Sequence, residues 1–454
     1  MEESKPKEKK FSRLEWSWIM YDWANSVYAT IMMAAVFPIL FSTIAGGEGQ
    51  DGDYWWGIGT ALSNIVVAVL APIVGALADF KGYRKKMFTI FFVIGVGFTL
   101  ASAFFGRWEL LLTGYVISHI GFSGSCLVYD SFLSEVTTKD RMDKVSGAGY
   151  GYGYIGGSTI PFLISIALIM FSSQIGSIFV SLGTGLNLDS VINFGTGFDE
   201  ITAIRISVVI AAVWWGFFTI PFLRDVKQNY SIDKPENYSL MKAAFSSAFE
   251  TAKKIIKNKK ILFFIIAYFF YIDGVGTVIS MSVVYGDTLG LGATDMVLAL
   301  FLTQVIAFPC TLWFSALAQR FGSRQMLQSA VCIYLVICAV GFIMGFGLEQ
   351  DLFGIGFATI LFFALACLVG TVQGGIQAIS RSYYCQMIPP ENSGEFFGFF
   401  DIFGKFAAVL GPALYSLVRV VTGSPAYAIL SIIALFLIGL IMLLAGGKYL
   451  KETE

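Results

Sequence analysis

Charged side chains stand inside long apolar runs of this sequence, where they could carry protons or bind a charged solute. Asp273 is the best placed, because a rise of about 1.5 Å per residue puts it roughly 18 Å along the run that begins at Ile261. A charge at that depth of a bilayer costs at least about 2.5 to 3.5 kcal/mol, so it usually faces a cavity or a partner. Gly274 and Gly276 follow it and favour a broken helix that exposes backbone to a solute. We favour proton or solute binding over a structural ion pair.

Asp22 and Asn25 give the first apolar run a polar face, because residues three apart lie on one side of a helix. The first and seventh runs are counterparts in an internal repeat, so we expect Asp22 and Asp273 to face each other across a central cavity. An alternative has equal weight. Asp22 stands between Tyr21 and Trp23, about one turn after the start of its run and near the inner membrane surface. There it would only mark the aromatic belt at the membrane interface.

Asp401 and Lys405 are four residues apart in the eleventh run, with the acid first, which is the favourable order for a helical ion pair. Lys405 is the one basic residue deep inside a run. It is therefore a candidate to bind a substrate carboxylate, or to neutralise Asp273 or Asp401. A pair that only stabilises the fold is an equally good interpretation.

His119 is the only histidine and lies in the fourth run. Its intrinsic pKa suits proton relay, but a lone histidine among serines is more often a hydrogen-bonded packing residue, and we favour packing.

Gln373 and Gln377 follow one side of the tenth run toward Arg381 and predict a polar wall of the cavity. Arg381 could instead anchor the helix at the cytoplasmic surface.

Composition places these residues in a membrane protein. Of 454 residues, 56% are hydrophobic and only 13% are charged, against about 25% charged in globular proteins, and the mean hydropathy is +0.73. This excludes a soluble enzyme. The balance of 30 basic and 31 acidic residues argues against nucleic-acid binding. The six cysteines have no C-x-x-C spacing and no companion histidines, so we expect no metal, no cofactor and no disulfide framework.

Twelve apolar runs are long enough to cross a bilayer, which takes about 20 residues. They begin near Trp18, Trp55, Met87, Glu109, Gly147, Ile204, Leu262, Thr294, Gln325, Phe353, Gly394 and Ala426. All but four of the 30 basic residues fall on one side if the N-terminus is cytoplasmic. We therefore predict an all-α integral membrane protein with both termini in the cytoplasm, in the inner membrane of a bacterium.

The sequence repeats itself. The loop G-A-L-A-D-F-K-G-Y-R (75–84) returns as S-A-L-A-Q-R-F-G-S-R (315–324), and glycine spacings of the fifth run return in the eleventh. The prediction is two pseudo-symmetric six-helix halves, joined by an amphipathic helix within 239–257. The divisions are a cytoplasmic tail (1–17), an N-terminal half (18–224), a cytoplasmic linker (225–260), a C-terminal half (261–447) and a second tail (448–454). The segment 173–202 is expected to be either a short lid or a re-entrant piece.

The repeated loop resembles the signature loop of the major facilitator superfamily, whose fold has two related halves. The resemblance implies gating roles for the loop residues Gly75, Asp79, Gly82, Arg84, Gly322 and Arg324. The alternative is a charged turn that only fixes topology, and we favour gating. Tyr83 departs from the pattern, because that place is usually basic.

Longer segments narrow the resemblance. W-I-M-Y-D-W-A-N-S-V-Y-A-T-I in the first run, Y-I-D-G-V-G-T-V-I in the seventh and S-G-E-F-F-G-F-F-D-I-F-G-K in the eleventh are similar to the vacuole-effluxer-like branch of that superfamily. The fungal namesake exports amino acids from the vacuole. The likeness covers nearly the whole chain and is specific for the branch, but not for the substrate.

These observations predict a secondary transporter, since no nucleotide-binding loop is present to drive it. We expect proton-coupled alternating access with an amino acid or a similar zwitterion as the small-molecule solute, by a monomer in the lipid bilayer. The alternatives are an uncoupled facilitator, an exporter of a more apolar drug-like or lipid-like solute, and a receptor that does not transport.

Overall fold

The computed structural model describes residues 10–175, 199–233 and 239–448. It contains 12 helical segments long and apolar enough to cross a membrane, which confirms the predicted number of spans. Most of the segment 173–202 lies outside the described residues.

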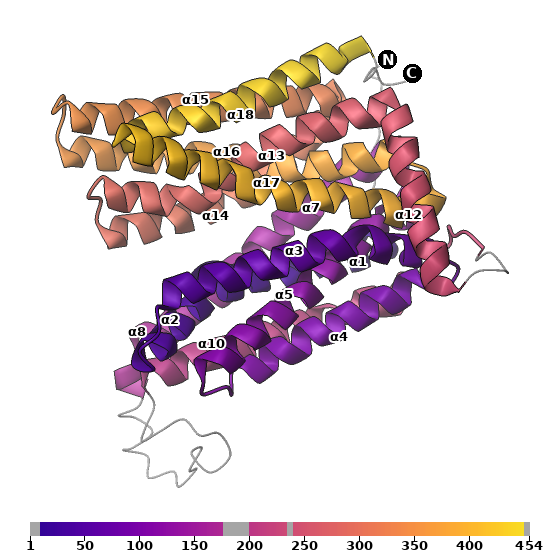
Figure 1. The fold of residues 1–454 in the computed structure, drawn as a ribbon, viewed down its shortest axis with the longest axis horizontal. Helices are drawn as coiled ribbons and strands as arrows, with labels where there is room; N and C mark the ends of the chain where they lie inside the picture. Colours follow the sequence, from indigo (N-terminus) through magenta and orange to yellow (C-terminus); the bar gives the residue numbers. More distant parts are fainter. Residues whose placement is uncertain (1–9, 176–198, 234–238, 449–454) are drawn as a thin grey trace, which may run out of the picture.

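The N-terminal half comprises α1 (Arg13–Tyr28), α2 (Val36–Gly47), α3 (Gly52–Asp79), α4 (Arg84–Ser102), α5 (Trp108–Ser131), α6 (Leu133–Val136), α7 (Met142–Tyr152), α8 (Ile160–Met170), α10 (Glu200–Phe218) and α11 (Ile220–Asp225). The C-terminal half comprises α13 (Lys259–Thr288), α14 (Ala293–Phe321), α15 (Ser323–Glu349), α16 (Ile355–Met387), α17 (Ser393–Thr422) and α18 (Pro425–Ala445). Between them, α12 (Leu240–Lys257) crosses the end of the bundle at which the described chain begins and ends (Figure 1). We call this end the terminal end and the opposite one the far end.

Two spans of the N-terminal half change helix type partway. The π-helical segment Ala29–Ala35 joins α1 to α2, and Gly153–Thr159 joins α7 to α8. The second segment packs against α1, and glycine is required there, because a Cβ at Gly156 would lie 2.0 Å from the Trp23 ring. The glycine-rich sequence therefore serves close packing of the first and fifth spans.

The two halves repeat a local bond at equivalent places. In α1, Ser26 Oγ donates to the Asp22 carbonyl at 2.7 Å, and in α13, Thr277 Oγ1 donates to the Asp273 carbonyl at 2.7 Å. Each acid thus precedes a hydroxyl that bonds back one helical turn. This agrees with the predicted pseudo-symmetry of the first and seventh spans.

The halves meet toward the terminal end. In Figure 1 they converge where the chain begins and ends, and they diverge toward the far end. The main helix contacts between the halves are α3 with α17, and α7 with both α14 and α16. At the first, glycine lets the backbones touch, because a Cβ at Gly75 would lie 2.2 Å from the Gly394 carbonyl oxygen. The described molecule is therefore closed at its terminal end.

Candidate functional site

Arg381 of α16 crosses from the C-terminal half into the N-terminal half. Its Nη2 lies 2.9 Å from Asp22 Oδ2 of α1, and its Nη1 lies 2.9 Å from Asp130 Oδ1 of α5. Its Nε donates to Ser146 Oγ of α7 at 2.9 Å. Only 2% of the residue is exposed. The guanidinium therefore does not anchor the helix at a wet surface but joins three helices of the opposite half, through charge-assisted hydrogen bonds.

Aromatic faces enclose the same guanidinium. Its central carbon lies 4.4 Å from the ring centroid of Tyr150, 4.6 Å from Trp18 and 5.5 Å from Tyr129. Cation–π attraction of this kind strengthens when water is excluded. The close approach also needs Gly149, because a Cβ there would lie 2.2 Å from Asp22 Oδ2. We call the set Arg381, Asp22, Asp130, Ser146, Trp18, Tyr129 and Tyr150 the arginine cluster.

The arginine cluster has one carboxylate more than it has cations when Asp22, Asp130 and Arg381 are all ionised. Asp22 and Asp130 face a single guanidinium. Asp22 is buried, whereas 24% of the Asp130 side chain is exposed. An unpaired charge in such surroundings is costly, so a further proton or cation would be favoured there.

Lys405 of α17 also reaches across the interface. Its Nζ donates to Ser123 Oγ of α5 at 3.2 Å, whereas Asp401 Oδ2 is buried with no hydrogen-bond partner within the described chain. Among the described side chains, Asp401 and Lys405 make no direct salt bridge, although their charges still interact. The hydrogen-bond partner of Lys405 comes from the opposite half, because α17 packs on α5.

Asp273 has a different setting from Asp22. It is wholly buried, and its Oδ1 accepts a hydrogen bond from the Gly411 backbone of α17 at 2.8 Å. Its Oδ2 has no partner among the described residues. Asp22 is neutralised by Arg381, so the prediction that the two acids face each other across one cavity finds no support in these contacts. Asp273 is a buried carboxyl group with one oxygen available for a proton or a ligand donor.

His119 is enclosed by the N-terminal half. Its Nδ1 lies 2.8 Å from Ser63 Oγ, and its ring stacks with Tyr115 at 5.7 Å and Phe122 at 6.4 Å. The side chain is wholly buried. Its Nε2 has no hydrogen-bond partner among the described residues, so packing rather than proton relay stays a prediction.

Gln373 and Gln377 lie on α16 two and one turns before Arg381. Gln377 Nε2 donates to the Gln373 carbonyl at 3.1 Å, and the Tyr154 ring packs over neighbouring Gly374, where a Cβ would lie 2.6 Å away. Asn25 is buried on α1, one turn beyond Asp22. These amides adjoin the arginine cluster on the side away from the terminal end.

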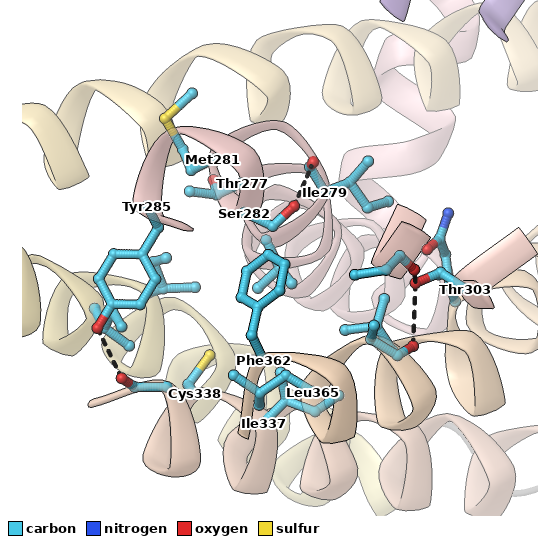
Figure 2. A pocket seen from close by; sticks show the side chains of 18 of the residues that line it. Thr277, Ile279, Met281, Ser282, Tyr285, Thr303, Ile337, Cys338, Phe362 and Leu365 are labelled. Atoms are coloured by element: carbon cyan, nitrogen blue, oxygen red, sulfur yellow. Dashed lines mark hydrogen bonds between the residues drawn. The ribbon is translucent and has the colours of Figure 1, made fainter. Parts of the chain in front are cut away.

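An apolar pocket of about 130 Å³ opens inside the C-terminal half (Figure 2). Its walls include Met281, Ile337, Phe362 and Leu365, from α13, α15 and α16. Tyr285 Oη donates to the Gly341 carbonyl at 2.7 Å and thereby closes one side.

Two polar atoms in the lining are buried without a partner in the described chain, Gln304 Oε1 and Tyr415 Oη. Gln373 lines the same pocket and so connects it with the amides of α16. An apolar pocket with a few polar groups is the usual form of a small-molecule site.

The first repeated loop lies at the terminal end as an ion-paired turn. Asp79 Oδ1 lies 2.6 Å from Arg84 Nη2, and Arg84 Nη1 lies 2.9 Å from Glu135 Oε1. All three side chains are buried. Burial raises the pKa of the Glu135 carboxyl group above its ordinary value, and the nearby Arg84 opposes that rise. Gly82 makes the turn with φ of 78°, a left-handed conformation that favours glycine.

Asp79 also joins the two halves. Its carboxylate accepts the backbone N–H groups of Gly394 and Glu395, each at 2.8 Å, at the first turn of α17. A helix N-terminus has unpaired N–H groups and a partial positive charge, which a carboxylate satisfies.

The second loop uses different contacts. Gly322 turns the chain with φ of 90°, and Arg324 Nε donates to the Leu443 carbonyl of α18 at 3.2 Å. Gln319 stands where the first loop has Asp79, and its Nε2 donates to the Asp140 carbonyl at 3.1 Å. The acid that joins the halves near this loop is Asp143, which accepts from Ser323 Oγ at 2.7 Å and from Ser382 Oγ.

Sequence reasoning missed Asp130, Ser146, Tyr150 and Asp143. Asp130 carried a usable signal, because it is an acid near the end of a spanning run. Ser146 and Tyr150 carried no such signal in the sequence.

Comparison with known proteins identifies relatives along the whole chain. Residues 57–446 match the family described as vacuole effluxer Atg22 like. A protein of Bacillus subtilis (strain 168), described as the uncharacterized MFS-type transporter YxiO, is 40% identical over 96% of this chain and 95% of its own length. Autophagy-related protein 22 of Coccidioides immitis is 22% identical over 83% of this chain and 69% of its own.

Solved structures share the fold. A bacterial homologue of the iron transporter ferroportin in an outward-facing state superposes with a TM-score of 0.64, at 13% identity, over 96% of this chain and 98% of its own. The major facilitator transporter FucP in the outward conformation superposes with a TM-score of 0.63, at 13% identity, over 97% of this chain and 98% of its own. At such identities the likeness concerns the fold alone, and it confirms the predicted major facilitator architecture.

Proposed function

Because the chain belongs to the Atg22-like vacuole effluxer family of major facilitator transporters, we propose that it moves an amino acid or a similar small zwitterion by proton-coupled alternating access. The protein works as a monomer in a bacterial plasma membrane, with its terminal end in the cytoplasm. It is a transporter and not an enzyme. The substrate class, the coupling ion, the monomeric state and the orientation are parts of the proposal.

The arginine cluster carries the proposal. It is buried at the interface of the two halves and contains one excess carboxylate beside a cation from the opposite half. In an alternating-access carrier the halves rock about the central site. A charge network that spans the halves therefore senses every change of state, and a ligand that alters its charge alters the balance between states.

The charges near the interface suit a zwitterion. Lys405 offers an ammonium group to a solute carboxylate, and its hydrogen-bond partner among the described residues is the neutral hydroxyl of Ser123. The excess carboxylate of Asp22 and Asp130 offers a partner to a solute amine. Gln373 and Gln377 supply neutral hydrogen-bonding groups between these positions and the apolar pocket.

Proton coupling follows from the same charges. A proton on Asp22 or Asp130 removes the charge of one of the two carboxylates that accept from Arg381 and weakens the link between the halves. Asp273 is the second candidate carrier, because its Oδ2 lacks a partner in the described chain. Protonation of the arginine cluster or of Asp273 would favour opening of the terminal end, and in this way the proton gradient would drive the change between states.

Gating is assigned to the first repeated loop. The carboxylate of Asp79 holds the start of α17, and Arg84 orients that carboxylate from the other side. Opening the terminal end must break these bonds, because α3 and α17 belong to different halves.

A second candidate function is an uncoupled facilitator or exporter of a more apolar solute. The observation in its favour is the apolar pocket of the C-terminal half, which has few polar atoms.

The decisive experiment reconstitutes the protein in liposomes with a pH-sensitive dye inside and screens amino acids and small organic solutes. Solute-driven proton movement that Asp273→Asn or Asp130→Asn abolishes supports the proposal. Movement of labelled solute without protons would replace it with the facilitator.

A further inference from the structure

The amphipathic helix α12 has three surfaces. Its buried face packs against α3 and the starts of α13 and α17, and consists of Ala243, Ala244, Ala248, Thr251 and Ile255. One flank is apolar and exposed, with Met241 50%, Phe245 55%, Phe249 64% and Ile256 65% accessible. We call these four residues the apolar stripe. The third surface is polar and contains the exposed residues Ser246, Glu250, Lys253 and Lys257.

Helical spacing separates the stripe from the polar surface. The stripe residues recur at intervals of four and seven, so they form one line along the helix. Lys253 and Lys257 lie four apart on the adjoining line, and Lys253 Nζ lies 4.4 Å from the ring centroid of Phe249. The ammonium group of Lys253 therefore borders the apolar stripe, and Lys257 lies one turn further along the same line.

The position of α12 matches this division. The helix lies across the terminal ends of membrane-spanning helices (Figure 1), with Ala244 and Ala248 clustered with Ala76 and Phe80 at the end of α3. This is the level at which the apolar core of a bilayer gives way to its headgroups.

We propose that α12 binds the anionic surface of the bilayer and that this binding holds the terminal end closed. The apolar stripe inserts at the boundary of the acyl chains, and Lys253 and Lys257 contact lipid phosphates. A basic residue near an anionic leaflet contributes about 1 kcal/mol, so charge complementarity favours a lipid partner for this flank.

Hydrogen bonds connect α12 to the gate. Ser247 Oγ and Thr251 Oγ1 both donate to the carboxylate of Glu395 at the start of α17. The backbone N–H of the same Glu395 donates to Asp79 Oδ2 at 2.8 Å. A helix fixed on the membrane surface therefore supports the residue that fastens α17 to α3. This coupling step rests on the proposed function, whereas lipid binding does not.

The first experiment tests lipid binding with the full chain in phosphatidylcholine vesicles, with and without phosphatidylglycerol. An environment-sensitive fluorophore is attached at Phe249→Cys or at the neighbouring Glu250→Cys, in a background lacking reactive cysteines. We expect nitroxide-labelled lipid to quench the probe at 249 several-fold more than the probe at 250, and aqueous iodide to do the reverse. Equal iodide quenching at both positions would overturn the proposal.

The lysines are tested in the same vesicles. The double variant Lys253→Gln with Lys257→Gln should lose the additional lipid quenching that phosphatidylglycerol causes at 249. A control removes two charges from exposed residues at the same end, Lys81→Gln with Lys139→Gln, and should retain it. Equal loss in both variants would show a nonspecific charge effect and contradict the assignment.

The second experiment tests coupling with spin labels at Lys139 and Gln325, which are exposed on opposite halves at the terminal end. Phosphatidylglycerol should increase the population with the short interspin distance. The variant Ser247→Ala with Thr251→Val should keep lipid contact at 249 but lose this increase. Lipid contact with an unchanged distance distribution would refute the coupling alone. A single distance under every condition would instead count against alternating access, and so against the proposed function.

Discussion

Arg381 and Asp22 are 359 residues apart in the sequence, yet the guanidinium of one lies 2.9 Å from the carboxylate of the other. The contact places a cation of the C-terminal half inside the N-terminal half, in a site closed by aromatic rings. Under the proposed alternating access, the halves could not separate at the terminal end without disrupting this pair, so its strength would contribute to the balance between states.

Replacement of Arg381 by Gln should strongly destabilise the protein. It leaves the buried carboxylate of Asp22 and the partly exposed carboxylate of Asp130 without a cation. Breaking a fully buried pair typically costs about 3 to 5 kcal/mol. The thermal unfolding midpoint in detergent should fall, and solute-driven proton movement should be lost.

The double variant Arg381→Gln with Asp22→Asn should recover part of that stability, because it removes one of the unpaired charges. Arg320→Gln, at an exposed arginine of α14, is the matched control and should leave the midpoint unchanged. A double variant no more stable than Arg381→Gln alone would argue against the charge explanation.

Asp79→Asn should weaken the closure of the terminal end. The amide keeps the shape of the carboxylate but lacks the charge that favours a helix N-terminus, an interaction worth about 0.3 to 2 kcal/mol. Spin labels across the terminal end should report a larger open population, and transport should slow while solute affinity stays unchanged.

The control for this substitution is Asp51→Asn, because Asp51 caps α3 within one half by accepting from the Tyr54 backbone at 3.0 Å. It should leave the populations as they are. A normal transport rate in Asp79→Asn at normal expression would count against gating by this residue.

Gly75→Ala should push α3 away from α17. The added Cβ would lie 2.2 Å from the Gly394 carbonyl oxygen, closer than any real contact, and the obstacle is backbone rather than a flexible side chain. The open terminal end should therefore be favoured in the same distance measurement. Gly97→Ala, where nothing lies within 4 Å of the added atom, serves as the control. Similar distance distributions in the two variants would contradict the importance of this contact.

Ala366→Phe should fill the apolar pocket. Ala366 lines it and is 9% exposed, so the larger ring occupies space that an apolar part of a solute would need. Among the transported solutes, those with large apolar groups should lose apparent affinity several-fold, while the smallest should be little affected. Val336→Phe, at an exposed position of α15, should change neither. Uniform loss for all solutes would indicate a packing defect instead of a solute pocket.

The overall architecture followed from the sequence because its signals are local. Hydropathy marked the twelve spans, and the repeated loop carried enough identity to relate the two halves. The bond from Thr277 to the Asp273 carbonyl, matched by Ser26 and Asp22, shows that this symmetry extends to single hydrogen bonds.

The sequence could predict some residues of the site but not how they pair. Asp22 and Arg381 were recognisable as charges in apolar runs, but their pairing depends on how the halves meet, which no local pattern encodes. The i, i+4 spacing of Asp401 and Lys405 was a local pattern, and it could not reveal the hydrogen bond from Lys405 to Ser123 of α5. The apolar pocket was invisible, because its lining residues are the ones that every spanning helix contains.

The arginine cluster has a consequence for leakage. The salt bridges of Arg381 and the bonds between Asp79 and α17 join the two halves at separate places. The first contact depends on charge, and the second depends on the docking of a helix. Under the proposed alternating access, loosening the first contact leaves the second in place, so an empty carrier can rest in a membrane without short-circuiting the gradient across it.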